Sequence, residues 1–90
     1  MIYKVQLSPH AARQYKKLDL SLKSSIQSGI DVLARSPLTG SHVKRLKGRL
    51  HEYHRYRIGD YRIVYTVSHQ DRIVYVDYIQ HRKDIYRGME

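Results

Sequence analysis

Apolar and polar residues alternate along four short stretches of the chain, residues 3–7, 53–58, 61–66 and 72–80. Alternation with a period of two predicts half-buried strands. Residues 9–18 and 22–35 instead repeat apolar side chains at helical spacing. Ser8 and Pro9 are a good N-cap and first residue for the first helix, and Ser36-Pro37 ends the second. The order β-α-α-β-β-β predicts an α+β fold, an antiparallel sheet with a two-helix hairpin packed on one face. We expect the first strand at the sheet edge or beside the last strand.

The dipeptide Gly59-Asp60 separates two of these strands and predicts a β-hairpin. Glycine at the first central position of a two-residue loop suits a type II′ turn, which fixes how the flanking residues pair. Counting outward from the turn, the opposed pairs are Ile58/Tyr61, Arg57/Arg62, Tyr56/Ile63, Arg55/Val64 and Tyr53/Thr66.

One side of this hairpin carries Arg55, Arg57 and Arg62, which we call the arginine face. Like charges directly opposite each other destabilise an antiparallel pair, so the Arg57/Arg62 opposition is easiest to explain if an anion binds there. Guanidinium groups match the geometry of phosphate and stay charged at any working pH. The alternative is a solvated arginine surface. The other side of the hairpin is apolar and is expected to cover the core.

The segment 38–52 has no hydrophobic period and is strongly basic. Four cationic residues surround Gly48, namely Lys44, Arg45, Lys47 and Arg49. We expect a loop that ends in at most a short strand. A charged loop contacts nucleic acid or is merely solvated, and the sequence leaves both interpretations open.

The composition indicates one small domain, residues 1–90, with an acidic partner. Seventeen Lys and Arg against eight Asp and Glu give a net charge of +9. Nucleic acid is the first candidate partner and an acidic protein segment the second, while a membrane surface is weaker because no helix has a basic face opposite a bulky apolar one. The absence of cysteine favours the reducing cytoplasm. The apolar runs are too short for an export signal or a membrane helix.

The six histidines do not show the spacing of a metal site, and we expect no cofactor. His51 and His54 are on opposite faces if the segment is a strand, and no carboxylate pair accompanies them. His81 ends the last strand beside Arg82, where we expect it to reach the arginine face as a proton donor or acceptor. An ordinary exposed histidine is the alternative.

Three motifs follow one another along the chain: Leu46-Lys47-Gly48, the hairpin with Arg57-Ile58-Gly59-Asp60-Tyr61-Arg62, and the terminal His81-Arg82-Lys83-Asp84-Ile85-Tyr86. Together they resemble the signature of the RelE/ParE toxin superfamily, and more closely its RelE-like branch. The resemblance extends over essentially the whole chain, including its length, its opening strand and helical hairpin, and its basic surface.

The resemblance implies a RelE-like fold and a metal-independent, ribosome-dependent endoribonuclease. Such toxins cut messenger RNA in the ribosomal A site by attack of the ribose 2′-hydroxyl on the adjacent phosphate. The residues that match the family's catalytic positions are Arg57, Arg62, Arg82 and Tyr86, with His81 as a further basic group. The residues expected to contact RNA are Lys44, Arg45, Lys47, Arg49 and Arg55. This chain has Val43 and Lys44 where some relatives carry a catalytic carboxylate, which argues against a glutamate base.

The resemblance also implies partners, namely an acidic, RelB-like antitoxin in a toxin–antitoxin hetero-oligomer, together with the ribosome and mRNA. No membrane partner is expected. Three alternatives remain open at this point. The chain could be a ParE-like inhibitor of DNA gyrase without nuclease activity, a non-catalytic nucleic-acid-binding module, or a degenerate, inactive toxin.

Overall fold

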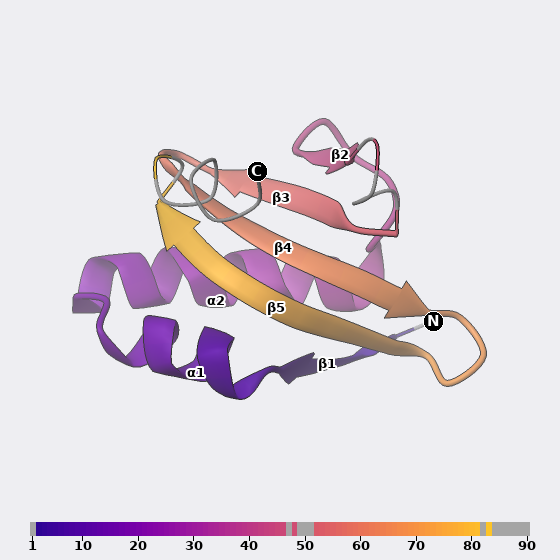
Figure 1. Cartoon of the computed structure of the whole chain (residues 1–90), viewed down its shortest axis with the longest axis horizontal. Coiled ribbons are helices and arrows are strands. Elements are labelled where there is room, and N and C mark those ends of the chain that lie inside the picture. Colours follow the sequence, from indigo (N-terminus) through magenta and orange to yellow (C-terminus); the bar gives the residue numbers. More distant parts are fainter. Residues whose placement is uncertain (1, 47, 49–51, 82, 84–90) are drawn as a thin grey trace.

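The computed structural model describes residues 2–46, 48, 52–81 and 83, and these form two helices and five strands (Figure 1). The elements are β1 (Lys4–Leu7), α1 (Pro9–Lys16), α2 (Leu20–Arg35), β2 (Val43–Arg45), β3 (His54–Ile58), β4 (Tyr61–Ser68) and β5 (Ile73–His81). The predicted α+β fold is confirmed. The order of elements contains β2 in addition to the predicted β-α-α-β-β-β.

The described strands form one sheet in the order β1-β5-β4-β3-β2. Strands β2 to β5 are antiparallel to their neighbours, whereas β1 runs parallel to β5. The first strand therefore lies beside the last, as predicted, but the sheet is not wholly antiparallel. The direction of β1 is fixed at both ends, because Lys4 N–H donates to Arg72 O at 2.9 Å and Ser8 N–H donates to Val76 O at 2.8 Å.

The β3–β4 hairpin has the predicted register, with Arg57 opposite Arg62. Gly59 has a φ of +57°, the positive value that the first central residue of a type II′ turn requires. The predicted Tyr53/Thr66 pair falls outside the ladder, because β3 begins at His54. The turn chemistry read from the sequence therefore places the arginines correctly along both strands.

The segment predicted as a loop contains the short edge strand β2. Its residues pair antiparallel with β3, so that Lys44 lies opposite Arg55 and Arg45 opposite His54. Three residues are too few to show an alternating pattern in the sequence. Residues 43–45 form a strand because they pair with β3. That pairing depends on the tertiary fold and not on the local sequence.

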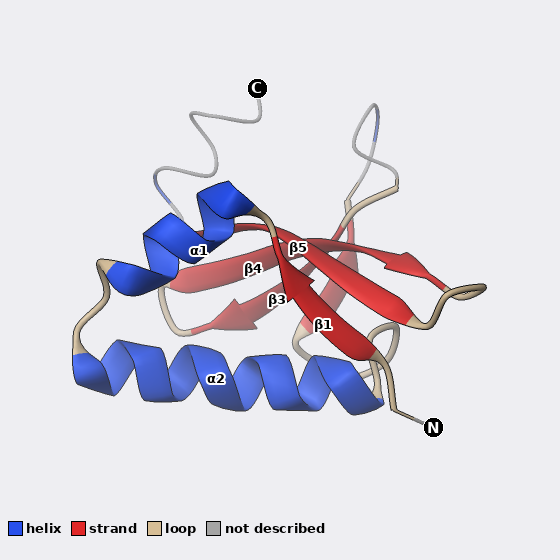
Figure 2. Ribbon diagram, turned by 90° about the horizontal axis from the view of Figure 1, so that it is seen from below, coloured by secondary structure: helices blue, strands red, loops and turns tan. Residues whose placement is uncertain are grey.

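Both helices begin at side-chain caps. Ser8 Oγ accepts a hydrogen bond from Ala11 N–H at 3.0 Å, and Asp19 Oδ1 accepts one from Leu22 N–H at 2.8 Å. Figure 2 shows α2 along one face of the sheet and α1 beside β1 and β5. Helix α1 ends at Lys16, shortly before the predicted limit. Within the described ranges, neither helix is long and apolar enough to cross a membrane.

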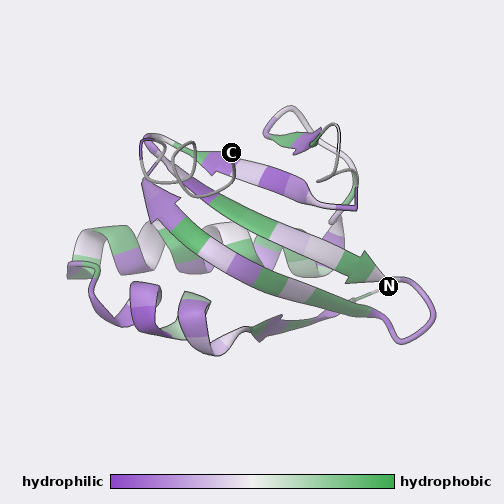
Figure 3. Ribbon diagram, in the orientation of Figure 1, coloured by the Kyte–Doolittle hydropathy of each residue, from purple (hydrophilic) through white to green (hydrophobic). Residues whose placement is uncertain are grey.

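The core lies between α2 and the central strands, where β4 and β5 carry most of the hydrophobic colour of the sheet (Figure 3). Ile63, Val74 and Val76 are fully buried there. Tyr65 is buried too, and its hydroxyl donates to Pro37 O at 2.6 Å. Burial raises the pKa of Tyr65, so this phenol keeps its proton and ties β4 to the end of the helical hairpin.

Candidate functional site

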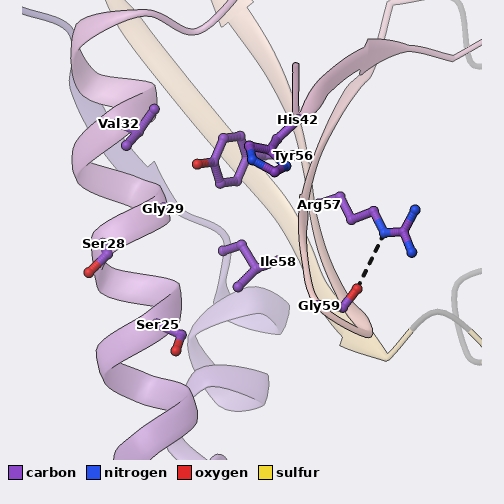
Figure 4. A pocket seen from close by; sticks show the side chains of 9 residues that line it. All are labelled: Ser25, Ser28, Gly29, Val32, His42, Tyr56, Arg57, Ile58 and Gly59. Carbon is purple, nitrogen blue, oxygen red and sulfur yellow. Dashed lines mark hydrogen bonds between the residues drawn. The ribbon is translucent and has the colours of Figure 1, made fainter. Parts of the chain in front are cut away.

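The β3–β4 hairpin has different chemistry on its two sides. Figure 4 shows Tyr56 and Ile58 directed toward α2, while Arg57 points away from the helix. Strand alternation places Arg55 on the same side as Arg57, and Arg62 joins them because it lies opposite Arg57. The hairpin thus presents the arginine face on the side of the sheet away from α2.

The three guanidinium groups differ in their exposure to solvent. Arg57 is exposed, and its Nε donates to Gly59 O at 3.4 Å, which holds the side chain near the turn. Arg55 is half-buried, but Arg62 is only 6% exposed. A solvated surface of three arginines, the alternative that the sequence left open, is therefore excluded for Arg62, because this side chain is buried. A buried cation attracts an anion more strongly than an exposed one, because less water screens the charge.

A second opposition of like charges extends the arginine face toward the sheet edge. Lys44 on β2 lies opposite Arg55, so the cations of β2, β3 and β4 occupy neighbouring positions on one side of the sheet. Sequence reasoning missed this pair because it treated β2 as part of a loop. Arg45 is next to Lys44 along β2 and therefore faces the other side.

Two hollows border Arg57. A polar hollow of about 260 Å³ is lined by Ser41, His42, Arg55, Arg57 and Gly59. A groove of about 400 Å³ separates α2 from β3, and its lining is drawn in Figure 4: Ser25, Ser28, Gly29, Val32, His42, Tyr56, Arg57, Ile58 and Gly59. The first hollow has the cations and the size to take a phosphate group.

His81 does not lie on the arginine face. It pairs with Tyr61, and the two rings meet edge to face with centroids 5.4 Å apart. The neighbouring pair, Arg62 and Gln80, points to the opposite side of the sheet. The expectation that His81 would reach the arginine face is therefore wrong, since the strand register turns its ring toward the helix-covered side. Its role in proton transfer stays a prediction.

Four of the expected site residues lie outside the described residues, namely Lys47, Arg49, Arg82 and Tyr86. Their roles stay predictions. In the part of the chain that is described, no three His, Asp or Glu side chains gather in a way that could hold a metal ion.

An acidic residue on β5 was missed by sequence reasoning. The β4–β5 ladder shifts register between Val64 and Tyr65, so that Val64 pairs with Tyr78, Tyr65 pairs with Val76, and Asp77 is the extra residue of a β-bulge. The side chain of Asp77 accepts a hydrogen bond from Tyr53, which precedes β3. The available signal was a single acid in an otherwise apolar and aromatic strand.

Comparison with known proteins identifies the family. The family model for the ParE toxin of type II toxin–antitoxin systems, parDE, matches residues 5–86. A protein of Methanocaldococcus jannaschii that bears the name toxin RelE1 is 30% identical over 90 residues, covering 98% of this chain and 99% of that protein.

Solved structures share the fold. The toxin–antitoxin complex RelBE2 from Mycobacterium tuberculosis contains a chain with a TM-score of 0.79 and 25% identity, and the match covers 91% of this chain and 100% of that chain. A double mutant of the E. coli toxin RelE in its free state matches with a TM-score of 0.77 and 19% identity over 97% of this chain and 93% of that one. Since the family model, a full-length relative and the fold agree, this chain belongs to the RelE/ParE family and is a toxin of a type II toxin–antitoxin system.

Proposed function

We propose that this toxin is a ribosome-dependent mRNA endonuclease. The observation that carries the proposal is the opposition of Arg57 and Arg62, with Lys44 opposite Arg55 beside it. Two like-charge oppositions gather cations on one face of a small sheet, and an anion of high charge density bound there would offset their mutual repulsion. The phosphates of an RNA strand supply that anion.

The nucleophile and the leaving group of the proposed reaction both belong to the RNA. The ribose 2′-oxygen attacks the adjacent phosphorus and loses its proton, the bond from phosphorus to the 5′-oxygen breaks, and that oxygen takes up a proton. The products are a 2′,3′-cyclic phosphate and a free 5′-hydroxyl. Negative charge develops on the phosphoryl oxygens in between, and we assign its stabilisation to Arg57 and Arg62, which lie opposite each other.

Only family resemblance assigns roles to Tyr86, which stacks on the substrate nucleotide or takes a proton from it, and to Arg82, the basic group of the tail. A tyrosine titrates near pH 10 in water, so Tyr86 could act as a base only beside cations that lower its pKa. Arginine hardly loses its proton, so Arg82 fits a charge-stabilising role better than that of a general acid. The ribosome would then supply much of the substrate orientation, which is why cleavage of free RNA is expected to be slow.

The proposed function also implies a protein partner, an antitoxin. Solved relatives from Mycobacterium tuberculosis and Pyrococcus horikoshii are complexes of RelE-type toxins with RelB-type antitoxins. An acidic, RelB-like antitoxin suits a chain of net charge +9, and covering Arg57 would block RNA binding. We place the toxin in the cytoplasm, where the ribosome and the antitoxin are made.

A second function, inhibition of DNA gyrase without cleavage, is favoured by one observation. The family model that matches residues 5–86 is that of the ParE toxin. A protein-binding inhibitor, however, has no evident need for opposed arginines on its sheet, which is why we rank the nuclease first.

The experiment that tests the nuclease is Arg57→Ala, because Arg57 is exposed and its loss opens no core cavity. We expect mRNA cleavage on translating ribosomes to fall by roughly a hundredfold, the usual loss when one donor to a developing oxyanion is removed. Primer extension maps the mRNA ends after induction, and a melting curve verifies the fold. Arg35→Ala, an exposed arginine at the end of α2, is the matched control.

Arg62→Ala is a poorer test, because Arg62 is buried and its removal also disturbs packing. Arg62→Lys keeps the charge and most of the volume, and we expect it to retain part of the activity. If the unaltered protein arrests growth with no new mRNA ends and changes DNA supercoiling, the gyrase inhibitor replaces the nuclease.

A further inference from the structure

The β-bulge on β5 adds a carboxylate to the side of the sheet that carries the cations of β2, β3 and β4. Asp77 is the only acidic residue within the five described strands. Its backbone is fixed by Ser8, whose Oγ donates to Asp77 O at 3.0 Å. Bulges commonly redirect one side chain, often next to a functional site, and they cost a ladder position. We therefore ask what function the bulge at Asp77 serves.

Tyr53 holds this carboxylate on the side of the arginine face. Tyr53 precedes β3 by one residue and, by alternation, faces the same side as Arg55. Because β4 lies between β3 and β5, the hydrogen bond to Asp77 reaches across β4 on that side. The bond to Asp77, together with burial, raises the pKa of Tyr53 to about 12. Tyr53 thus remains a donor, and the carboxylate of Asp77 has further lone pairs that can accept hydrogen bonds.

Aromatic rings flank the carboxylate. Tyr78 follows Asp77 directly and contributes to the electrostatic environment of Tyr53. Its ring meets the ring of His10 edge to face, with centroids 5.3 Å apart. Sequence-specific proteins read single-stranded RNA by stacking splayed bases on aromatic rings and by hydrogen bonding to their Watson–Crick edges. Tyr53, Asp77 and Tyr78 provide both components.

A carboxylate can bind only those parts of an RNA strand that donate hydrogen bonds. Asp77 repels phosphate, so on an RNA-binding surface it needs a ligand that donates hydrogen bonds. Guanine presents two adjacent donors on its Watson–Crick edge, N1–H and the 2-amino group, which match the two oxygens of a carboxylate. Adenine and cytosine present one amino group beside an acceptor, which a carboxylate pairs with less well.

We propose that Asp77, positioned by Tyr53, recognises a guanine base of the RNA bound on the arginine face. This inference rests on the proposed function for its ligand class. Tyr78 lies opposite Val64, and Val64 is separated from Arg62 by one residue of β4. Two residues along a strand span roughly 7 Å. The recognised base therefore belongs to a nucleotide next to the one whose phosphate meets Arg62.

The test measures the equilibrium binding of short single-stranded RNAs to the toxin by fluorescence anisotropy, without ribosomes. The probes are oligouridylates that contain one guanosine, one inosine or one 1-methylguanosine at the same position. Inosine lacks only the 2-amino group, and 1-methylguanosine carries a methyl group in place of the N1 hydrogen. We expect the unaltered toxin to bind the guanosine probe about tenfold more tightly than either analogue, the usual discrimination of a bidentate contact to a base.

Asp77→Asn should abolish this preference, because an amide replaces one acceptor with a donor. Asn still accepts the hydrogen bond from Tyr53, so the link between β3 and β5 is kept. Asp31→Asn is the matched control, since it makes the same charge change on an exposed residue of α2 and should leave the preference intact. Tyr53→Phe should weaken the preference; a purely structural link would instead lower the melting temperature with the probe ratio unchanged.

Equal affinity of the unaltered toxin for the guanosine and inosine probes would overturn the inference, and so would an Asp77→Asn variant that keeps the preference. If a variant fails to fold, the comparison of probes with the unaltered toxin still decides. Binding is measured apart from cleavage, so the two proposals can fail separately. A toxin that cuts mRNA without preferring guanosine refutes only the inference, while one that prefers guanosine but never cuts refutes only the nuclease.

Discussion

His54 lies against Tyr65, with ring centroids 5.8 Å apart and ring planes 24° from parallel. Its Nδ1 is buried and has no hydrogen-bond partner among the described residues. Burial, and then the charge of Arg45 on the paired strand, lowers the pKa of His54 below its ordinary value of 6.5. The neutral ring is thus the form that the folded protein favours.

Acidification should therefore destabilise the toxin through His54. Above pH 6.5 the ring is neutral in both states, but below it the unfolded chain binds a proton that the folded protein resists, so the free energy of unfolding falls. We expect the urea midpoint to decrease between pH 7.5 and 5.5, and His54→Gln to reduce that decrease. His10→Gln, an exposed position on α1, serves as the control. An unchanged pH dependence in His54→Gln would show that another group is responsible.

At the scale of elements, α2 packs tightly against β3 at Gly29. A Cβ atom at this position would lie 2.5 Å from Ile58 Cδ1 and 3.0 Å from Tyr56 Cε2. Glycine costs about 1 kcal/mol of helix propensity relative to alanine, so its presence in α2 reflects packing. Because glycine has no Cβ atom, α2 can lie this close to β3.

Gly29→Ala should lower stability in spite of its better helix propensity. Overpacking of a core costs about 1–3 kcal/mol, which exceeds the gain of about 1 kcal/mol in propensity. Adding Ile58→Val removes the Cδ1 atom that clashes, so the double variant should recover part of the loss. Thermal melting of the single and double variants measures both effects. Ser28→Ala, the exposed preceding residue, should leave the melting temperature nearly unchanged.

The sequence predicted the elements whose signals are local. Gly59-Asp60 determined the hairpin register, and Ser8 marked the start of α1. The features that the sequence did not predict depend on which other segments of the chain lie beside them in the fold. The strand β2 needs β3 beside it, the bulge at Asp77 arises from how β4 and β5 fit, and the burial of Arg62 depends on what packs around β4. Charge and register can be read from a sequence, but exposure of a side chain requires the complete sheet.

At the scale of the whole molecule, the cations behind the net charge of +9 are not all expected to contact RNA. Lys44 lies in the extension of the arginine face, whereas Lys4 lies on β1 at the opposite edge of the sheet. Both lysines are exposed, so they contribute equally to the net charge. Only the first is expected to contact a phosphate of bound RNA.

Lys44→Gln should therefore reduce the salt dependence of RNA binding more than Lys4→Gln. Each phosphate contact to a single strand contributes about 0.7 to the slope of log K against log salt concentration. We expect Lys44→Gln to lower the slope by about that amount and Lys4→Gln to leave it almost unchanged. Titrations of an oligouridylate at several salt concentrations provide the slopes. Equal slopes for the two variants would mean that RNA does not follow β2, β3 and β4.

The pairing of β1 with β5 also bears on how a cell produces this toxin. The strand synthesised first finds its partner in residues 73–76, far along the chain, and contacts between distant segments form late in folding. Strand β4, which carries Arg62, likewise pairs over its whole length with β5. The sheet that carries the arginine face therefore stays unfinished until residues 73–81 have left the ribosome. If the proposed function is correct, the ribosome that makes the toxin works throughout that time beside a protein whose arginine face has not yet formed.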